Sequence, residues 1–208
     1  MKVLVINGSP RAKGNTFKAL ELCAKTLNDH GIETEIFQIG TKPIHGCTGC
    51  RACKSNEQEY CIFTDDITNE LIEKMRYADG IIVGSPVYFA GLAGSLKCFL
   101  DRAFYSNSRH MRFKPCAAIA VARRAGSTST FDQINHYFAL GEMINVPTVY
   151  WSDVYGEQIG EIEQDKEGLN HVEIIGHNMA WLLKTLEAGK EKVPVPERIK
   201  REKTNFIR

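Results

Sequence analysis

The sequence predicts a three-layer α/β fold, in which a doubly wound parallel sheet of five strands lies between layers of helices. Two observations predict it: five short strand-like segments alternate with five longer amphipathic ones, and the short segments are rich in Val and Ile, as strands buried on both faces are. At 208 residues the chain has the length of one domain with a substantial core. The six-stranded dinucleotide fold is less favoured, because its Gly-x-Gly-x-x-Gly fingerprint is absent.

The elements follow from apolar periodicity. Strands are expected over residues 2–6, 33–38, 80–84, 116–122 and 146–151, and helices over 16–29, 66–78, 94–105, 128–140 and 166–188. Asp65 or Asp66 is expected to cap the second helix, while Gly31 and Gly141 stand where the first and fourth helices should stop. Residues 1–189 form the predicted domain. The tail over 190–208 is too poor in apolar residues to fold alone, so we expect it either to lie across a partner subunit or to be loose.

The helix over 94–105 carries a clear apolar stripe. Leu96, Phe99 and Leu100 are spaced as one face of a helix that packs on the core. We therefore expect the charged residues Lys97 and Arg102, with Asp101 between them, to lie on the opposite, solvent-facing side.

Charge and composition exclude several functions. Lys and Arg number 26 against 25 for Asp and Glu, a net charge of +1, which offers no electrostatic footprint for nucleic acid or an anionic membrane. No apolar run approaches membrane-spanning length, and the first residues read as a strand with no signal peptide. A cytoplasmic protein is expected.

The loop over residues 7–16 joins the first strand to the first helix and is dense in hydrogen-bond donors. Ser9, Arg11, Asn15 and Thr16 supply hydroxyl, guanidinium and amide groups, and Gly14 lets the backbone approach a ligand closely. The free N–H groups of the first helical turn complete an anion cradle. No lysine stands at the Walker position, so the loop suits a single terminal phosphate, such as that of FMN, better than a nucleoside triphosphate. An ordinary polar turn is the alternative.

Two further loops should meet the first at the carboxyl ends of the strands, where such sheets bind ligands. The loop over 85–93 contains a proline and neighbouring aromatic residues, which suit a flat ring system: Pro86, Val87, Tyr88 and Phe89. The loop over 123–127 is basic, and the residues expected to face the same crevice are Arg123, Arg124, Gly126 and Ser127. An arginine near the pyrimidine edge of a flavin would favour its reduced, negatively charged form. Surface ion pairing is the alternative for the arginines.

Four of the seven cysteines gather in a short stretch with the spacing Cys47-x2-Cys50-x2-Cys53-x7-Cys61. Three thiols at successive x2 spacing can occupy three corners of one cubane, a ferredoxin-like arrangement. Zinc sites more often use two separated Cys-x2-Cys pairs. An iron–sulfur cluster, a zinc ion and free thiols all stay open. The other three are expected in the core: Cys23, Cys98 and Cys116.

Three motifs in order resemble one known family. They are Gly8-Ser9-Pro10-Arg11…Gly14-Asn15-Thr16, then Ser85-Pro86-Val87-Tyr88, then Leu96-Lys97…Phe99-Leu100-Asp101-Arg102. Over residues 1–190 the chain looks like the NAD(P)H-dependent FMN reductase and iron–sulfur flavoprotein branch of the flavodoxin-like superfamily. The resemblance implies that the first loop binds the FMN phosphate, residues 86–89 lie along the isoalloxazine ring and the loop over 123–127 closes on its polar edge. It also implies a [4Fe–4S] cluster on the four clustered cysteines and a homodimer or homotetramer.

The function expected from this resemblance is an FMN-dependent oxidoreductase. NAD(P)H would deliver hydride to FMN, and a small acceptor (a flavin, a quinone, or a nitro or azo compound) would take the electrons. The alternative is an iron–sulfur flavoprotein that receives single electrons from a ferredoxin through the cluster. A flavodoxin-like binding protein without turnover is the third possibility. Hydride transfer needs no acid–base side chain, so we expect no catalytic triad.

Overall fold

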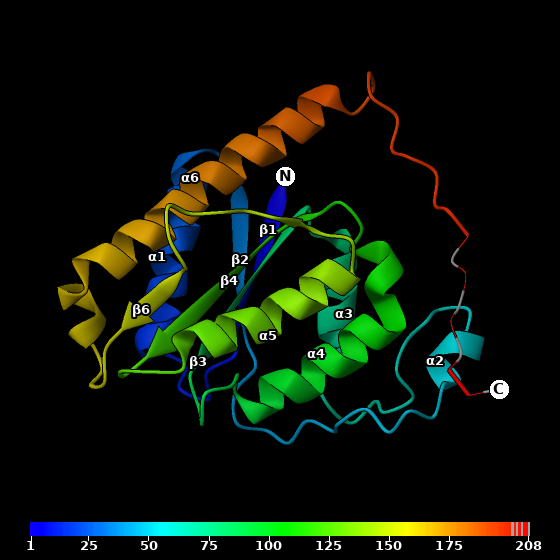
Figure 1. Cartoon of the computed structure of the whole chain (residues 1–208), viewed down its shortest axis with the longest axis horizontal. Coiled ribbons are helices and arrows are strands. Elements are labelled where there is room, and N and C mark those ends of the chain that lie inside the picture. Colours follow the sequence, from blue (N-terminus) through cyan, green and yellow to red (C-terminus); the bar gives the residue numbers. More distant parts are fainter. Residues whose placement is uncertain (201, 203, 205, 208) are drawn as a thin grey trace.

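The computed structural model of this chain describes residues 1–200, 202, 204, 206 and 207. A parallel sheet has the order β2-β1-β3-β4-β5 (Figure 1). The short strand β6 also pairs with β4, at its carboxyl-terminal end, whereas β5 pairs with the start of β4. The strands are β1 (Lys2–Asn7), β2 (Glu33–Gln38), β3 (Gly80–Pro86), β4 (Pro115–Ala122), β5 (Ile144–Asn145) and β6 (Asp153–Tyr155). The helices are α1 (Asn15–Asp29), α2 (Ala52–Ser55), α3 (Thr68–Tyr77), α4 (Gly94–Asn107), α5 (Ser127–Leu140) and α6 (Lys166–Gly189). Two 3₁₀ turns are η1 (Ser108–His110) and η2 (Glu161–Gln164).

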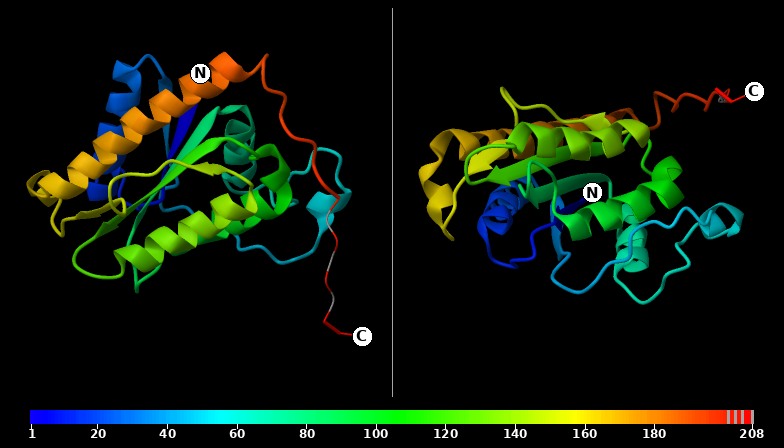
Figure 2. Two further views of the ribbon diagram at one scale, coloured as in Figure 1. Left: turned by 45° about the horizontal axis from the view of Figure 1, so that its top comes forward. Right: turned by 60° about the horizontal axis from the view of Figure 1, so that its bottom comes forward.

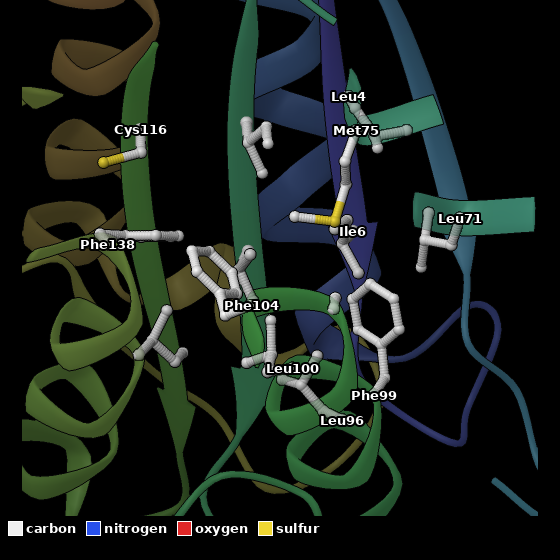
Figure 3. Close-up of a cluster of buried hydrophobic side chains, with 14 of the residues drawn as sticks. Leu4, Ile6, Leu71, Met75, Leu96, Phe99, Leu100, Phe104, Cys116 and Phe138 are labelled. Carbon is white, nitrogen blue, oxygen red and sulfur yellow. The ribbon is translucent and has the colours of Figure 1, made fainter. Parts of the chain in front are cut away.

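The central strands divide their side chains between two cores. Val3 and Val5 point to one face of the sheet, which α1 and α6 cover, while Leu4 and Ile6 point to the other, which α3, α4 and α5 cover (Figure 2). Figure 3 shows the second core, in which apolar side chains of α4 such as Phe99 lie against the sheet. Burying one large apolar side chain of this kind stabilises the folded state by about 1.5–3 kcal/mol relative to leaving it exposed. The predicted doubly wound fold is confirmed, and its helix layers leave the carboxyl ends of the strands free for loops.

The predicted single strand over 146–151 is wrong. Two short strands replace it, β5 beside the start of β4 and β6 beside its end. Hydrogen-bond pairing with β4 ends where the Val146 amide donates to Cys116 O at 2.8 Å, just before Pro147, whose ring restricts the backbone. Ser152 restores the pairing: its side chain donates to Ala118 O, and its carbonyl accepts from the Ala120 amide at 3.0 Å.

The predicted helix stops at Gly31 and Gly141 are confirmed, whereas the N-cap residue of α3 is Ile67, with Asp66 just before it. An oxygen of Asp66 accepts the Thr68 amide at 3.0 Å at the start of α3. Gly31 follows α1 with a φ of +76°, and Gly141 follows α5. A left-handed residue lets the chain turn away after a helix, and glycine adopts that conformation without a steric cost.

The prediction for one face of α4 is wrong at one residue. Lys97 and Asp101 lie on the exposed side and pair with each other at 2.9 Å. Arg102, however, is 2% exposed. The segment over residues 44–66 covers this edge of α4, so the helix has a second buried strip that apolar periodicity does not reveal.

The tail leaves α6 and runs toward α2 (Figures 1 and 2). Arg112 donates to Pro196 O at 2.8 Å, and Arg198 pairs with Glu142 at 2.7 Å, so this part of the tail contacts its own chain. Packing of the tail on a partner subunit stays a prediction; residues 201, 203, 205 and 208 of it lie outside the described residues. In the part of the chain that the structure describes, no helix is both long and apolar enough to cross a membrane.

Candidate functional site

Three loops meet at the carboxyl ends of β1, β3 and β4, beside the point where strand order reverses. The Gly8 amide donates to Gly84 O at 2.8 Å, so the first loop lies directly against β3. A side chain at Gly8 would place its Cβ only 2.5 Å from Leu96 Cδ2. A Cβ at Gly126 would lie 2.8 Å from Ala90 Cα, so the third loop packs against the second equally closely. Glycine is required at both contacts.

The loop over residues 7–16 presents an uncapped helix end. No side chain caps α1, whose N-cap residue is Gly14, so the first-turn amides keep their hydrogens available. The buried Ser9 hydroxyl accepts the Arg11 amide at 3.1 Å and still has its own hydrogen to donate. Thr16 is buried at the start of the helix. Arg11 is exposed and makes no ion pair with any described residue. These features form a cradle for an anion.

The side chain of Asn15 makes two hydrogen bonds within the chain. Its side-chain amide donates to Gln158 O and accepts from the Gly160 amide, both at 2.9 Å. Its side chain thus fastens the first loop to the loop that follows β6. The backbone amide of Asn15 still belongs to the uncapped turn.

The loop over 85–93 folds into a tight hairpin. Tyr88 and Gly91 exchange two backbone hydrogen bonds, of 2.9 and 3.0 Å. Between them, Phe89 and Ala90 have φ values of +50° and +56°, a left-handed conformation that costs non-glycine residues free energy. Phe89 is fully exposed at the tip, and Tyr88 is half exposed. A strained turn that projects an aromatic ring into solvent is typical of a ligand contact.

Two polar residues support this hairpin. The Val87 amide donates to Val121 O at 2.9 Å, and Pro86 ends β3. The Ser85 hydroxyl accepts the Ala93 amide at 3.0 Å, while Gln133 of α5 bonds Leu92 N and Ala90 O. Sequence reasoning missed Gln133, because nothing in the sequence indicates which backbone groups a glutamine on a helix will bond.

The two arginines of the loop over 123–127 differ in their ion pairing. Arg123 pairs with Glu157 at 3.1 Å on an exposed surface, which is the surface ion pair left open above. Arg124 is exposed and has no ion pair among the described residues. The two residues line an open hollow with Tyr155 and Glu161.

Ser127 belongs to a buried polar cluster that sequence reasoning missed. Its hydroxyl donates to Asp153 Oδ2 at 2.7 Å, and the Tyr155 hydroxyl donates to the same oxygen at 3.0 Å. The hydrogen bond with Ser127 lowers the pKa of Tyr155, but burial and Asp153 outweigh it and raise that pKa. The cluster holds the start of α5 against β6. An aspartate within an apolar stretch was its only signal, and it lies just beyond the strand predicted over 146–151.

The four clustered cysteines line one pocket. Cys47 and Cys50 are exposed, Cys61 is half-buried and Cys53 is buried, and none forms a disulfide. Burial raises the pKa of the Cys53 thiol. Across the described residues, no three His, Cys, Asp or Glu side chains are already arranged to hold a metal ion. The pocket is completed by Arg102 and by aromatic and polar neighbours, including Phe63, Tyr105 and Ser106.

The remaining cysteines differ in burial. Cys23 and Cys116 are in the core as predicted, and burial raises the pKa of each to about 12. The prediction for Cys98 is wrong: it is half-buried on α4 and not in the core.

Comparisons with known proteins identify the family of this chain. The family model for NADPH-dependent FMN reductases matches residues 1–158. An iron–sulfur flavoprotein of Methanocaldococcus jannaschii is 35% identical over 195 residues, covering 90% of this chain and 100% of the relative. An iron–sulfur flavoprotein of Methanosarcina thermophila is 30% identical over 196 residues, covering 92% of this chain and 100% of that protein.

Solved structures share the fold. RosB, crystallised with bound 8-demethyl-8-formylriboflavin-5′-phosphate, matches with a TM-score of 0.69 at 16% identity, covering 100% of this chain and 94% of that one. A flavodoxin from the domain Archaea matches with a TM-score of 0.58 at 14% identity, covering 88% and 99%. The fold is therefore flavodoxin-like. The two relatives described above, which cover nearly all of this chain, are iron–sulfur flavoproteins. The chain belongs to the NADPH-dependent FMN reductase family of oxidoreductases.

Proposed function

We propose that this oxidoreductase binds FMN in the crevice formed by the three loops, binds a [4Fe–4S] cluster on Cys47, Cys50, Cys53 and Cys61, and exchanges electrons between a ferredoxin-type carrier and a small acceptor. The observation that carries the proposal is the gathering of four thiols at one pocket, in a chain that also has an uncapped helix end for a phosphate. When bound, FMN supplies redox chemistry in steps of one or two electrons, and the cluster supplies single-electron chemistry.

The residues of the crevice fit FMN. The first-turn amides of α1, the Ser9 hydroxyl and the unpaired Arg11 guanidinium would hold the phosphate, with Thr16 beside them. The exposed rings of Tyr88 and Phe89 would lie along the isoalloxazine. Arg124, free of an ion pair in the described chain, is the arginine available to the ring's polar edge.

The donor set of the cysteine pocket fits an iron–sulfur cluster. Four thiols are the complete ligand set of a [4Fe–4S] centre, and their x2, x2, x7 spacing brings all of them to one pocket. Residues 39–51, which carry two of them, form no helix or strand. No carboxylate or histidine lines the pocket, and a hard cation would require such ligands.

The route of electron entry is tested under anaerobic conditions. Protein loaded with FMN, ferrous iron and sulfide is mixed either with reduced ferredoxin or with NAD(P)H, and the flavin absorbance is followed. We expect bleaching with reduced ferredoxin. The Cys47→Ala/Cys50→Ala variant should keep its FMN but lose iron and ferredoxin-dependent bleaching, whereas the control Cys98→Ala should behave as wild type. Iron-loaded protein that ferredoxin does not reduce would contradict the proposal.

A second candidate is direct reduction by NAD(P)H, with delivery of electrons to a flavin, a quinone or another small acceptor. The NADPH-dependent description of the family favours it, and so does the open position of the hairpin tip, where one face of a stacked ring would stay accessible. In this case NAD(P)H bleaches the flavin equally fast in wild type and in the double cysteine variant. The same experiment therefore separates the two candidates.

A further inference from the structure

Arg102 is a buried cation that holds the cysteine segment at several points. Its Nε donates to Cys61 Sγ at 3.2 Å, and its Nη2 donates to Phe63 O at 3.0 Å. Its Nη1 donates to His45 O at 3.2 Å and pairs with Asp66. One side chain of α4 thus reaches the residues just before the first cysteine and those at the last one.

Asp66 completes the arrangement. Its side chain is 3% exposed, and besides Arg102 it accepts the amides of His45 at 3.1 Å and Thr68 at 3.0 Å. Desolvation makes a buried ion pair a poor source of stability, and a well-packed apolar pair is often as good. What an apolar pair lacks is directed N–H groups. The pair is therefore best explained by what its hydrogen bonds position.

One of those hydrogen bonds ends on a sulfur. Within the described chain, Cys61 is the one cysteine of the pocket whose sulfur receives a hydrogen bond from a cationic side chain. N–H groups directed at ligand sulfurs stabilise the more negative, reduced state of an iron–sulfur cluster and raise its reduction potential. The N–H···S bond from Arg102 would thus act on the reduction potential of a cluster bound here, which packing alone would not change.

We propose that Arg102 is a positioning residue for the [4Fe–4S] cluster: it holds Cys61 toward the other three cysteines and raises the cluster's reduction potential through its N–H···S bond. The inference rests on the proposed function, because it presumes that the pocket takes the cluster. It adds a residue outside the cysteine motif that sets cluster affinity and potential.

Arg76 is the matched control. Its side chain is 16% exposed and lies over the Tyr60 ring at 4.3 Å. It donates to Asn107 Oδ1 at 2.6 Å and to Gln58 O at 2.5 Å, so it holds the same segment between the third and fourth cysteines. None of its hydrogen bonds ends on sulfur. A purely structural role would be shared by the two arginines.

The test compares Arg102→Met, Arg102→Lys and Arg76→Met with wild type in the full chain. Each is reconstituted anaerobically with FMN, ferrous iron and sulfide, then assayed for iron, sulfide and FMN per chain and for the midpoint potential of the cluster. We expect Arg102→Met to keep FMN and lose about 10- to 100-fold in affinity for iron. Arg102→Lys should recover part of that affinity with a potential below wild type. Arg76→Met should keep the wild-type potential.

Full iron and sulfide with an unchanged potential in Arg102→Met would overturn the inference, as would an equal fall in potential in Arg76→Met. Hydrogen–deuterium exchange of the metal-free chain keeps the two proposals distinguishable. If wild type takes up no iron, the cluster itself is wrong. Faster exchange over residues 45–63 in Arg102→Met would then support only the positioning of the segment, and unchanged exchange would remove that as well.

Discussion

We expect the proposed phosphate site to depend most on Arg11. Replacing it with Ala removes a charge-assisted hydrogen bond worth about 1.5–3 kcal/mol, so the Kd for FMN should rise roughly 10- to 100-fold. Quenching of flavin fluorescence on titration of the apoprotein measures this. Lys13→Ala is the control, because Lys13 is an equally exposed cation of the same loop. Equal weakening in both variants would mean that only the loop's charge matters.

Residue-scale prediction succeeded where the chain is local and failed where distant segments meet. Ser9, Arg11 and Gly14 lie where a strand-to-helix loop must place them, so their positions followed from sequence order. The burial of Arg102 depends on a segment about forty residues earlier in the chain, which has no periodicity to predict its path. A helical pattern predicts which face is apolar, but it does not predict that a separate segment of the chain buries part of the other face.

The pair of Asp66 and Arg102 should also give stability a defined pH dependence. Burial raises the pKa of Asp66, but the hydrogen bonds from Arg102 and the Thr68 and His45 amides outweigh it and hold that pKa below its usual value. The stabilisation is thus complete above the unfolded pKa of about 4 and is lost as pH falls through the folded pKa. Urea unfolding at several pH values measures it. The stability gap between wild type and Asp66→Asn should narrow below about pH 4; a constant gap would assign the stability elsewhere.

At the scale of elements, the hairpin over Tyr88–Gly91 combines strain with an exposed ring. Phe89→Asn with Ala90→Gly supplies the residues that a type I′ turn prefers, so the free energy of unfolding should rise by about 1 kcal/mol. The same variant removes the aromatic tip, so FMN should bind more weakly. Chemical denaturation and FMN titration measure the two effects. A variant that is more stable and binds FMN as tightly as wild type would show that the ring of Phe89 does not contact the flavin.

The edge of the sheet shows why element boundaries were harder to predict than element types. The run from Val146 to Trp151 is apolar enough to read as a strand, but the ladder with β4 ends at Val146, beside Pro147, and the chain leaves the sheet before returning at Asp153. Strands such as β1 and β4 have no such interruption, and their positions were predicted. The buried cluster around Asp153 was missed because the predicted strand ended before Asp153, which begins β6.

At the scale of the whole molecule, the strand order was predictable because a parallel doubly wound sheet without a dinucleotide fingerprint has few alternatives. Association was predicted only from the family resemblance. Exposed large apolar side chains on α6 and in the neighbouring segment before β6 include Val149, Tyr150, Trp151, Trp181 and Leu186. We propose that they lie in a homodimer or homotetramer interface.

Sedimentation velocity tests this interface. Wild type should sediment as a dimer or tetramer, and Trp151→Glu with Trp181→Glu should shift it toward monomer, because charged side chains are costly to bury in an interface core. Tyr77→Glu is the control, since Tyr77 is an exposed aromatic residue at the end of α3. Monomeric wild type would refute the assembly.

The most direct test of the central claim, that one chain carries both an FMN site and a four-cysteine cluster site, is quantitative analysis of protein purified without exposure to air. We predict one FMN together with about four iron and four sulfide per chain, as a [4Fe–4S] centre requires. FMN without iron and sulfide would leave a flavin oxidoreductase with free thiols, and protein that neither contains nor takes up FMN would contradict the account as a whole.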